Sequence, residues 1–177
     1  ANEPGSVLEM NKMKEIGVEK VTINMGVGAT GAELEKAITI LKTLTGATPV
    51  KTLCKVKQPA WGLRPGLPIG TKVTLRKEKA AVFLKDALAA KDNHLLAKSF
   101  DNYGNFAFGI KEYIDMPKVK YDPKFGIRGF DVLVALKRPG FRVKRRKLEK
   151  KRIPKRHCIK KEESMEFVKN VFGVQVE

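Results

Sequence analysis

The chain has 177 residues, enough for one folded domain with appendages but short for two. Hydrophobic residues make up 42%, which supports a folded core, while 36 Lys and Arg against 19 Asp and Glu give a formal net charge of +17. Such an excess favours an anionic partner, nucleic acid first and an acidic membrane surface second. No apolar run approaches the roughly 20 residues that span a bilayer, and two cysteines are too few for a disulfide framework, so we expect a soluble intracellular protein.

A half-buried strand is predicted near the start of the chain, after a loose lead over residues 1–17. Apolar and polar side chains alternate over residues 18–25, which predicts a strand with one buried face. The buried face carries Val21, Ile23 and Met25. Asn24 is therefore expected to point away from the core.

A glycine turn over residues 26–31 follows this strand and opens a helix. Thr30, with Glu33 three residues later, matches a capping box at a helix N-terminus. Apolar residues at helical spacing continue to Leu44, and Gly46 stands where a left-handed cap belongs. The turn is either a phosphate site built from backbone amides or a purely structural turn.

Two strand-like runs, residues 50–56 and 72–76, flank a loop rich in glycine and proline. Proline lacks a ladder donor and glycine weakens extended segments, so we expect the loop to project from the sheet. It carries Lys55, Lys57, Trp61 and Arg64. Cations beside an aromatic ring suit RNA, whose backbone is anionic and whose bases stack. The alternative is an ordinary connection with its Trp folded onto the core.

The remaining pattern predicts further helices and strands. Helices are predicted over residues 80–89, with Val82 in the core, and over 161–172, and strands over 106–110 and 131–137. This order predicts an α+β fold: a two-layer domain with a largely antiparallel sheet, helices packed on one face, and a basic C-terminal extension ending in a helix.

Most of the charge excess lies in a basic segment, residues 137–161, which holds 14 basic side chains and one acidic one. It has few apolar residues and is interrupted by prolines, so we expect it to be disordered alone in water and to order on a polyanion. A nuclear-import signal or a solvated tail is the alternative. We therefore divide a single domain, residues 1–177, into the lead, an α+β core over 18–136, the basic segment and a terminal helix over 162–177.

One motif points to a different class of protein. Residues 26–31, GVGATG, match the G-x-G-x-x-G fingerprint of dinucleotide-dependent enzymes. That unit needs an acid about 20 residues further on, but residues 36–77 hold nine Lys or Arg and no Asp or Glu. The His and Cys spacings do not make a metal site, and no carboxylate pair is gathered, so we predict no catalytic site and no metal site.

Several motifs taken together resemble the family of large-subunit ribosomal protein five. They are KVTINMGVG (20–28), LTGATPV (44–50), GLPIGTKVTLR (66–76) and GNFAFGIKE (104–112). RPGFRV (138–143) and the closing helix that begins with KEE resemble archaeal and eukaryotic members. The resemblance covers the chain in order from about Val18 to Val174.

The resemblance implies binding without catalysis. Members bind 5S ribosomal RNA in the central protuberance of the large subunit, touch peptidyl-site transfer RNA (tRNA) and bridge to a small-subunit head protein. We therefore expect these partners, together with large-subunit rRNA and neighbouring ribosomal proteins, on cytoplasmic ribosomes. No cofactor, no membrane and no homo-oligomer are expected. A general RNA chaperone or membrane-surface protein with a basic tail is the rival among binding proteins.

The resemblance also assigns contact residues by position. Asn24 and Thr74 match polar residues through which relatives contact 5S rRNA, and Lys55, Lys57, Trp61 and Arg64 match the loop that contacts tRNA. Relatives often have Gln where Ala47 stands, and Thr48 is the candidate substitute. The full set of expected rRNA contacts is Asn24, Gly26, Gly28, Thr48, Lys51, Lys72, Thr74, Arg76, Arg142, Lys144, Arg145 and Arg146.

Overall fold

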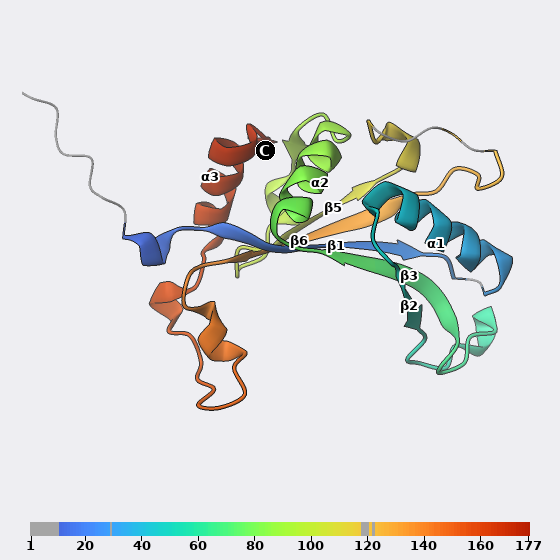
Figure 1. Ribbon diagram of the computed structural model, residues 1–177, viewed down its shortest axis with the longest axis horizontal. Helices are drawn as coiled ribbons and strands as arrows, with labels where there is room; N and C mark the ends of the chain where they lie inside the picture. The colour runs from blue at the N-terminus through green and yellow to red at the C-terminus, as the bar shows by residue number, and fades with distance from the viewer. Residues whose placement is uncertain (1–10, 29, 118–120, 122) are drawn as a thin grey trace, which may run out of the picture.

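The sheet that organises the chain has five antiparallel strands in the order β2–β3–β1–β6–β5 (Figure 1). The computed structural model describes residues 11–28, 30–117, 121 and 123–177. The strands are β1 (Gly17–Gly26), β2 (Val50–Leu53), β3 (Pro68–Leu75), β5 (Phe106–Ile110) and β6 (Phe130–Lys137). Because β1 pairs with both β3 and β6, the sheet brings together segments that are far apart in the sequence.

Three helices lie on one side of this sheet (Figure 1). They are α1 (Ala32–Thr45), α2 (Lys77–Ala89) and α3 (Lys161–Phe172). Alternate residues of β1 point toward them, and Val21, Ile23 and Met25 are fully or almost fully buried in the same cluster as Leu41 and Leu84. The expected two-layer α+β fold, with a largely antiparallel sheet and helices on one face, is confirmed.

The two ends of α1 differ in how well the sequence predicts them. The C-terminal cap is confirmed, since Gly46 has φ 61° and its N–H donates to the carbonyl of Lys42 at 2.9 Å. The predicted capping box is wrong. The residue before the helix is Gly31, with φ 81° and no side-chain cap, so Thr30 lies outside the helix. Glycine adopts such a φ without strain, and the chain enters α1 through it.

Helix α2 begins three residues earlier than predicted and buries a different face. Its buried residues are Ala80, Phe83, Leu84, Ala87 and Leu88, a spacing that forms one helical stripe. Val82 lies off that stripe and is 54% exposed, so its predicted place in the core is wrong.

The C-terminal residues add a small element that periodicity does not predict. Helix α3 spans the predicted residues 161–172 and ends there because Gly173 adopts φ 67°, so the terminal unit over 162–177 is not helical throughout. The chain then forms β7 (Gln175–Val176), which pairs in parallel with β4 (His94–Leu95). Strands of two residues are too short for an alternating pattern. Of the expected lead, residues 1–10 lie outside the described part of the chain.

Candidate nucleic-acid interface

The face of the sheet turned away from the helices is open (Figure 1). Asn24 of β1 lies directly between Lys72 of β3 and Asp131 of β6, and Thr22 lies opposite Thr74 in the next row. Directly opposed residues of antiparallel strands share a face, so these side chains form one polar surface. The predicted outward direction of Asn24 is confirmed, and Thr74 lies on the same face.

The polar groups of this open face are available for a ligand. Lys72, Thr74 and Asp131 are exposed, and Asn24 is half-buried. Across the described residues, none of these four side chains makes a hydrogen bond or an ion pair. A surface of unpartnered donors and acceptors is suited to the polar edges and hydroxyls of RNA.

Not every predicted rRNA contact lies on the open face. Lys51 of β2 is exposed but pairs with Thr71, which is completely buried on the helix side, so Lys51 points to the opposite side from Lys72. Thr48 precedes β2 and Arg76 follows β3, and both are exposed. The structure therefore groups Asn24, Lys72 and Thr74 and separates Lys51 from them.

Two backbone amides of the glycine turn already form hydrogen bonds within the protein. The N–H groups of Val27 and Gly28 both donate to the carbonyl of Ile69, at 3.1 and 2.9 Å. In the first turn of α1, Glu33 pairs with Lys36 at 3.0 Å and also with Arg128. The two bonded amides are not available to a phosphate, and the carboxylate works against one at the helix N-terminus. These observations favour the structural reading of the turn, and the contacts of Gly26 and Gly28 with rRNA stay a prediction.

The loop between β2 and β3 projects from the sheet and is internally braced. The Cys54 N–H donates to the Leu67 carbonyl at 2.8 Å, and the Gly66 N–H returns to the Cys54 carbonyl at 3.0 Å. Strand β2 ends at Leu53, short of the predicted Val56. At the tip, Gln58 and Leu63 form an isolated bridge. The predicted projection of the loop from the sheet is confirmed (Figure 1).

The tip of this loop presents an aromatic ring to solvent. Trp61 is 75% exposed, which contradicts the alternative that it folds onto the core. Lys55, Lys57 and Arg64 are exposed on the same loop. An exposed ring among cations can stack on a base while the cations contact phosphates.

The basic segment is tied to the body at both of its ends. Arg138 is buried, and its guanidinium donates to the Lys14 carbonyl at 3.1 Å and to the Cys158 carbonyl at 3.4 Å, and pairs with Glu163 at 3.0 Å. Burial raises the pKa of Glu163, but hydrogen bonds from the Lys160 N–H and from Arg138, with the charges of both, lower it by more, and the net pKa lies below its ordinary value. The segment is therefore less independent than its composition predicts.

Some cationic side chains of this segment form ion pairs within the protein, and others do not. Arg145 pairs with Glu19, and Arg146 pairs with Glu149 at 3.5 Å. Lys144 lies 4.5 Å from the centre of the Phe141 ring and is exposed. Arg142 is exposed and makes no ion pair with a described residue. Arg142 and Lys144 are thus the best placed of the four predicted contacts to reach a phosphate.

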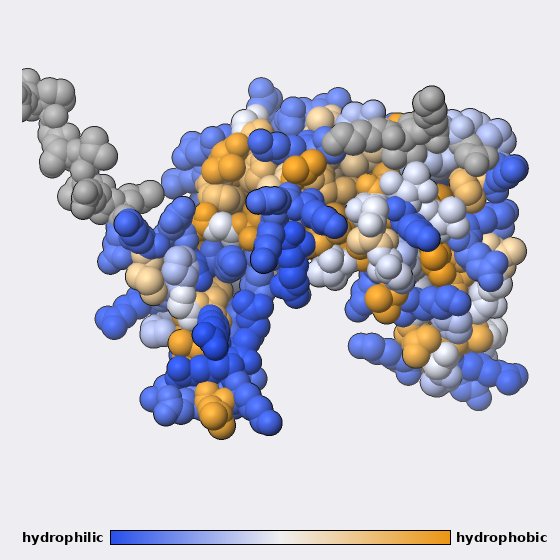
Figure 2. Space-filling model, viewed as in Figure 1, coloured by the Kyte–Doolittle hydropathy of each residue, from blue (hydrophilic) through white to orange (hydrophobic). Residues whose placement is uncertain are grey.

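The loop and the basic segment both descend from the sheet on the side away from the helices (Figure 1). Figure 2 shows a hollow between these two projections: the surface of the basic segment is largely hydrophilic, and that of the loop mixes hydrophilic and hydrophobic residues. The open face forms the roof of this hollow. A concave surface with cationic walls fits a rounded polyanion such as a folded RNA.

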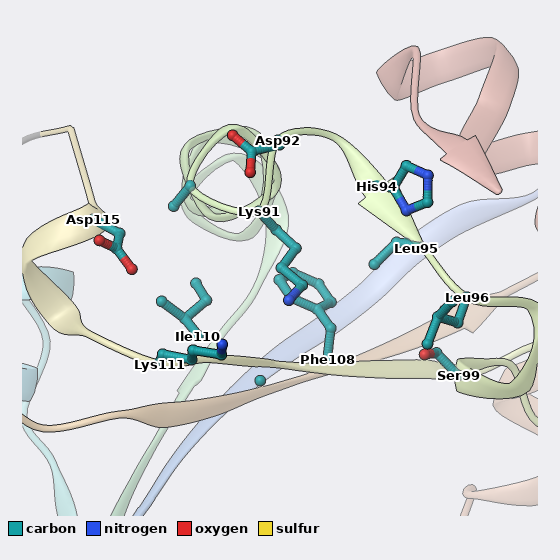
Figure 3. A pocket seen from close by; sticks show the side chains of 12 residues that line it. Lys91, Asp92, His94, Leu95, Leu96, Ser99, Phe108, Ile110, Lys111 and Asp115 are labelled. Carbon is teal, nitrogen blue, oxygen red and sulfur yellow. The ribbon is translucent and has the colours of Figure 1, made fainter. Parts of the chain in front are cut away.

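A separate cavity of about 600 Å³ lies between the end of α2, β4 and β5 (Figure 3). Its walls carry charges of both signs, and Figure 3 places His94 and Asp115 at opposite ends of it. Within the described ranges, no three His, Cys, Asp or Glu side chains are grouped to hold a metal ion. None of the described helices has the length and apolar character needed to cross a membrane.

The dinucleotide alternative is contradicted by the topology. A Rossmann unit requires parallel strands joined by helices, whereas β1 has antiparallel neighbours on both sides and α1 leads to β2 at the sheet edge. The GVGATG segment therefore lacks the sheet that its motif would need.

Two family models together match most of the chain. The model described as Ribosomal protein L5 matches residues 11–64, and the model for the C-terminus of the same ribosomal family matches residues 68–169. The second begins where β3 begins, after the projecting loop.

Curated relatives cover almost the full length. A protein of Sulfurisphaera tokodaii named large ribosomal subunit protein uL5 is 50% identical over 168 residues, which are 94% of this chain and 95% of that protein. Proteins of the same name are 47% identical in Methanococcus vannielii, over 96% of both chains, and 49% identical in Nanoarchaeum equitans, over 93% of this chain and 97% of the relative. The chain belongs to the ribosomal protein L5 family.

Proposed function

We propose that the chain is a structural constituent of the large ribosomal subunit and binds 5S rRNA across the open face of its sheet, on cytoplasmic ribosomes. Family membership supports the first part, because the relatives are named as large-subunit proteins, and it makes an enzyme the wrong class. The open face supports the second part. Its unpartnered polar row lies between two cationic projections in a chain of charge +17.

Phosphate contacts and shape-recognising contacts have different roles in RNA binding. The basic segment and Lys72 supply phosphate contacts, which give affinity without selecting an RNA. Asn24 and Thr74 lie at set positions in the sheet and recognise the shape of one folded RNA. The projecting loop contacts peptidyl-site tRNA, and other surfaces meet large-subunit rRNA, neighbouring ribosomal proteins and a small-subunit head protein.

The test of this function is the RNA that the protein retains. The chain is expressed in cells, purified at moderate salt, and its bound RNA is sequenced. The proposal expects one dominant species, 5S rRNA. A mixture that reflects total cellular RNA would instead indicate the general chaperone.

Neutralising the free cations of the basic segment should weaken the dependence of binding on salt. We expect Arg142→Gln with Lys144→Gln to lower the slope of log K against log salt by roughly 1.5, since each phosphate contact contributes about 0.7–0.9. Lys79→Gln with Lys85→Gln on α2 is the control, because these exposed lysines lie on the helix side of the sheet. Equal slopes for the two double variants would exclude the segment from phosphate binding.

The loop should act separately from the open face. Lys57→Ala with Arg64→Ala is expected to leave 5S rRNA affinity within about twofold of the wild type and to raise the dissociation rate of peptidyl-site tRNA from assembled ribosomes several-fold, because each loop cation is worth about 1 kcal/mol or less at an exposed site. Filter binding measures the first quantity and tRNA release the second. A parallel loss of both would argue against a distinct role for the loop.

A further inference from the structure

Asp131 is an acidic residue in an unexpected place. It lies on the open face, directly beside Asn24 in the register and opposite Gly109 of β5, and it is exposed. The chain holds 36 Lys and Arg, yet none of the described ones pairs with this carboxylate. A carboxylate here repels RNA phosphates. It favours binding only if the RNA brings hydrogen-bond donors to it.

The surface around Asp131 is hollowed and partly apolar. A cavity of about 490 Å³ is lined by Asn24, Lys72, Ala107, Gly109 and Leu133 together with Asp131. Two of these residues have a methyl side chain or none, so they leave the floor flat, and Leu133 is 43% exposed beside them. A flat apolar floor with polar groups at one end suits an unstacked base, whose faces are apolar and whose edge is polar.

The chemistry of a carboxylate narrows the choice of base. An ionised Asp has two acceptor oxygens and no donor, and it binds best to two parallel N–H groups. The Watson–Crick edge of guanine offers two adjacent donors, N1–H and N2–H, whereas the corresponding edges of adenine, cytosine and uracil place a donor beside an acceptor. The Asn24 amide, next to Asp131 in the sheet, can donate to the guanine O6.

We propose that this cavity holds one unpaired guanine of the bound RNA, with the Asp131 carboxylate accepting from its N1–H and N2–H. The proposal rests on the proposed function, because it assumes that RNA lies on the open face. In this proposal Asp131 selects guanine over the other bases, and the cations around the hollow contact phosphates. Phosphate contacts alone do not distinguish one RNA from another.

Asp131→Asn tests the proposal through effects of opposite sign. The amide keeps the shape but loses the paired acceptors, so affinity for 5S rRNA should fall about tenfold, as for other bidentate base contacts. The same change removes a negative charge, so affinity for an unrelated duplex RNA should stay equal or rise. Asp92→Asn, an identical change after α2 on the helix side, should leave both affinities unaltered. Affinities that rise together in Asp131→Asn would show that Asp131 is merely tolerated, and would overturn the proposal.

The guanine itself can be located with inosine, which lacks the N2 amino group. We expect inosine at one unpaired guanine to weaken the binding of 5S rRNA to the wild-type protein, because one of the two donors is lost, and to cause no further loss in Asp131→Asn. Inosine within duplexes affects both proteins alike. Identical inosine patterns for the two proteins would overturn the proposal while leaving 5S rRNA binding intact. A wild-type protein without preference for 5S rRNA would overturn the proposed function as well.

Gly109→Val provides a second variant that keeps the charge and fills the cavity. A Cβ at Gly109 would lie 3.5 Å from an Asp131 oxygen, an ordinary contact, and this glycine does not need a left-handed φ, so the variant should fold. We expect Gly109→Val to lose the sensitivity to inosine at the same position. Its affinity for duplex RNA should not rise. Wild-type affinity for 5S rRNA in Gly109→Val would mean that no base enters the cavity.

Discussion

Replacing Asn24 and Thr74 together by Ala is expected to lower the affinity for 5S rRNA by roughly fivefold to 150-fold. Each side chain is unpartnered among the described residues and can make one hydrogen bond to the RNA, and a hydrogen bond contributes about 0.5–1.5 kcal/mol. The stability should be unaffected because both side chains lie on the open face, outside the core. Filter binding and urea unfolding measure the two quantities.

A matched pair on the helix side controls for the loss of surface polarity. Asn170→Ala with Thr43→Ala removes the same atoms from exposed positions of α3 and α1. It should leave 5S rRNA affinity within about twofold. If the open-face pair behaves like this control, Asn24 and Thr74 do not contact the RNA.

Gly104→Ala is expected to have the largest effect on stability, about 2–5 kcal/mol. Gly104 has φ +77°, and a Cβ there would lie 2.5 Å from the Cγ2 of Ile159. The left-handed backbone costs an alanine about 1–2 kcal/mol. Ile159 is almost completely buried, so relieving the clash adds about 1–3 kcal/mol more. Urea unfolding gives the free energy directly.

Gly126→Ala separates these two costs. Gly126 has φ +67°, but among the described residues nothing lies within 4 Å of the position that its new methyl group would occupy. It should show the backbone cost alone. The difference between the two variants then measures how much the packing of Ile159, near the end of the basic segment, against this turn contributes. The Gly104 carbonyl in the same turn also accepts a 2.7 Å hydrogen bond from Ser164 of α3. Equal losses would mean that this packing contributes little.

The features that the sequence predicts correctly are those with local causes. The outward direction of Asn24 follows from the two-residue period of one strand, and the end of α1 follows from a glycine that adopts φ 61°. The charge of the loop and its exclusion from the sheet also follow from its own residues, since its prolines lack a ladder donor and its glycines weaken extended segments.

The features that it misses depend on tertiary pairing. Lys51 lies on the other side from Lys72 because of how β2 registers against β3, and no local pattern carries that register. In the sequence, Asp131 is one of several acidic residues that are far apart from one another. It joins the site only because β6 pairs with β1, which brings it beside Asn24, more than a hundred positions earlier. The sequence feature that indicates its outward direction is its place next to Val132, which is buried, in a strand of alternating residues.

The basic segment shows how composition can mislead about order. Its many charges predict disorder in isolation, but Arg138 and Phe141 at its start and Ile159 near its end are buried in the body. Three buried side chains and the ion pair to Glu163 hold the segment at its base, beside the open face. Its cations are therefore placed by the fold rather than left on a free tail.

A competition experiment tests most directly whether this fold recognises one RNA. Labelled 5S rRNA bound to the wild-type protein is displaced by unlabelled 5S rRNA or by an unrelated structured RNA of equal length, at about 0.15 M salt. We expect a preference for 5S rRNA on the order of a thousandfold, as in other specific nucleic-acid complexes. Equal displacement by the two RNAs would contradict the account, because phosphate contacts alone would then explain the binding.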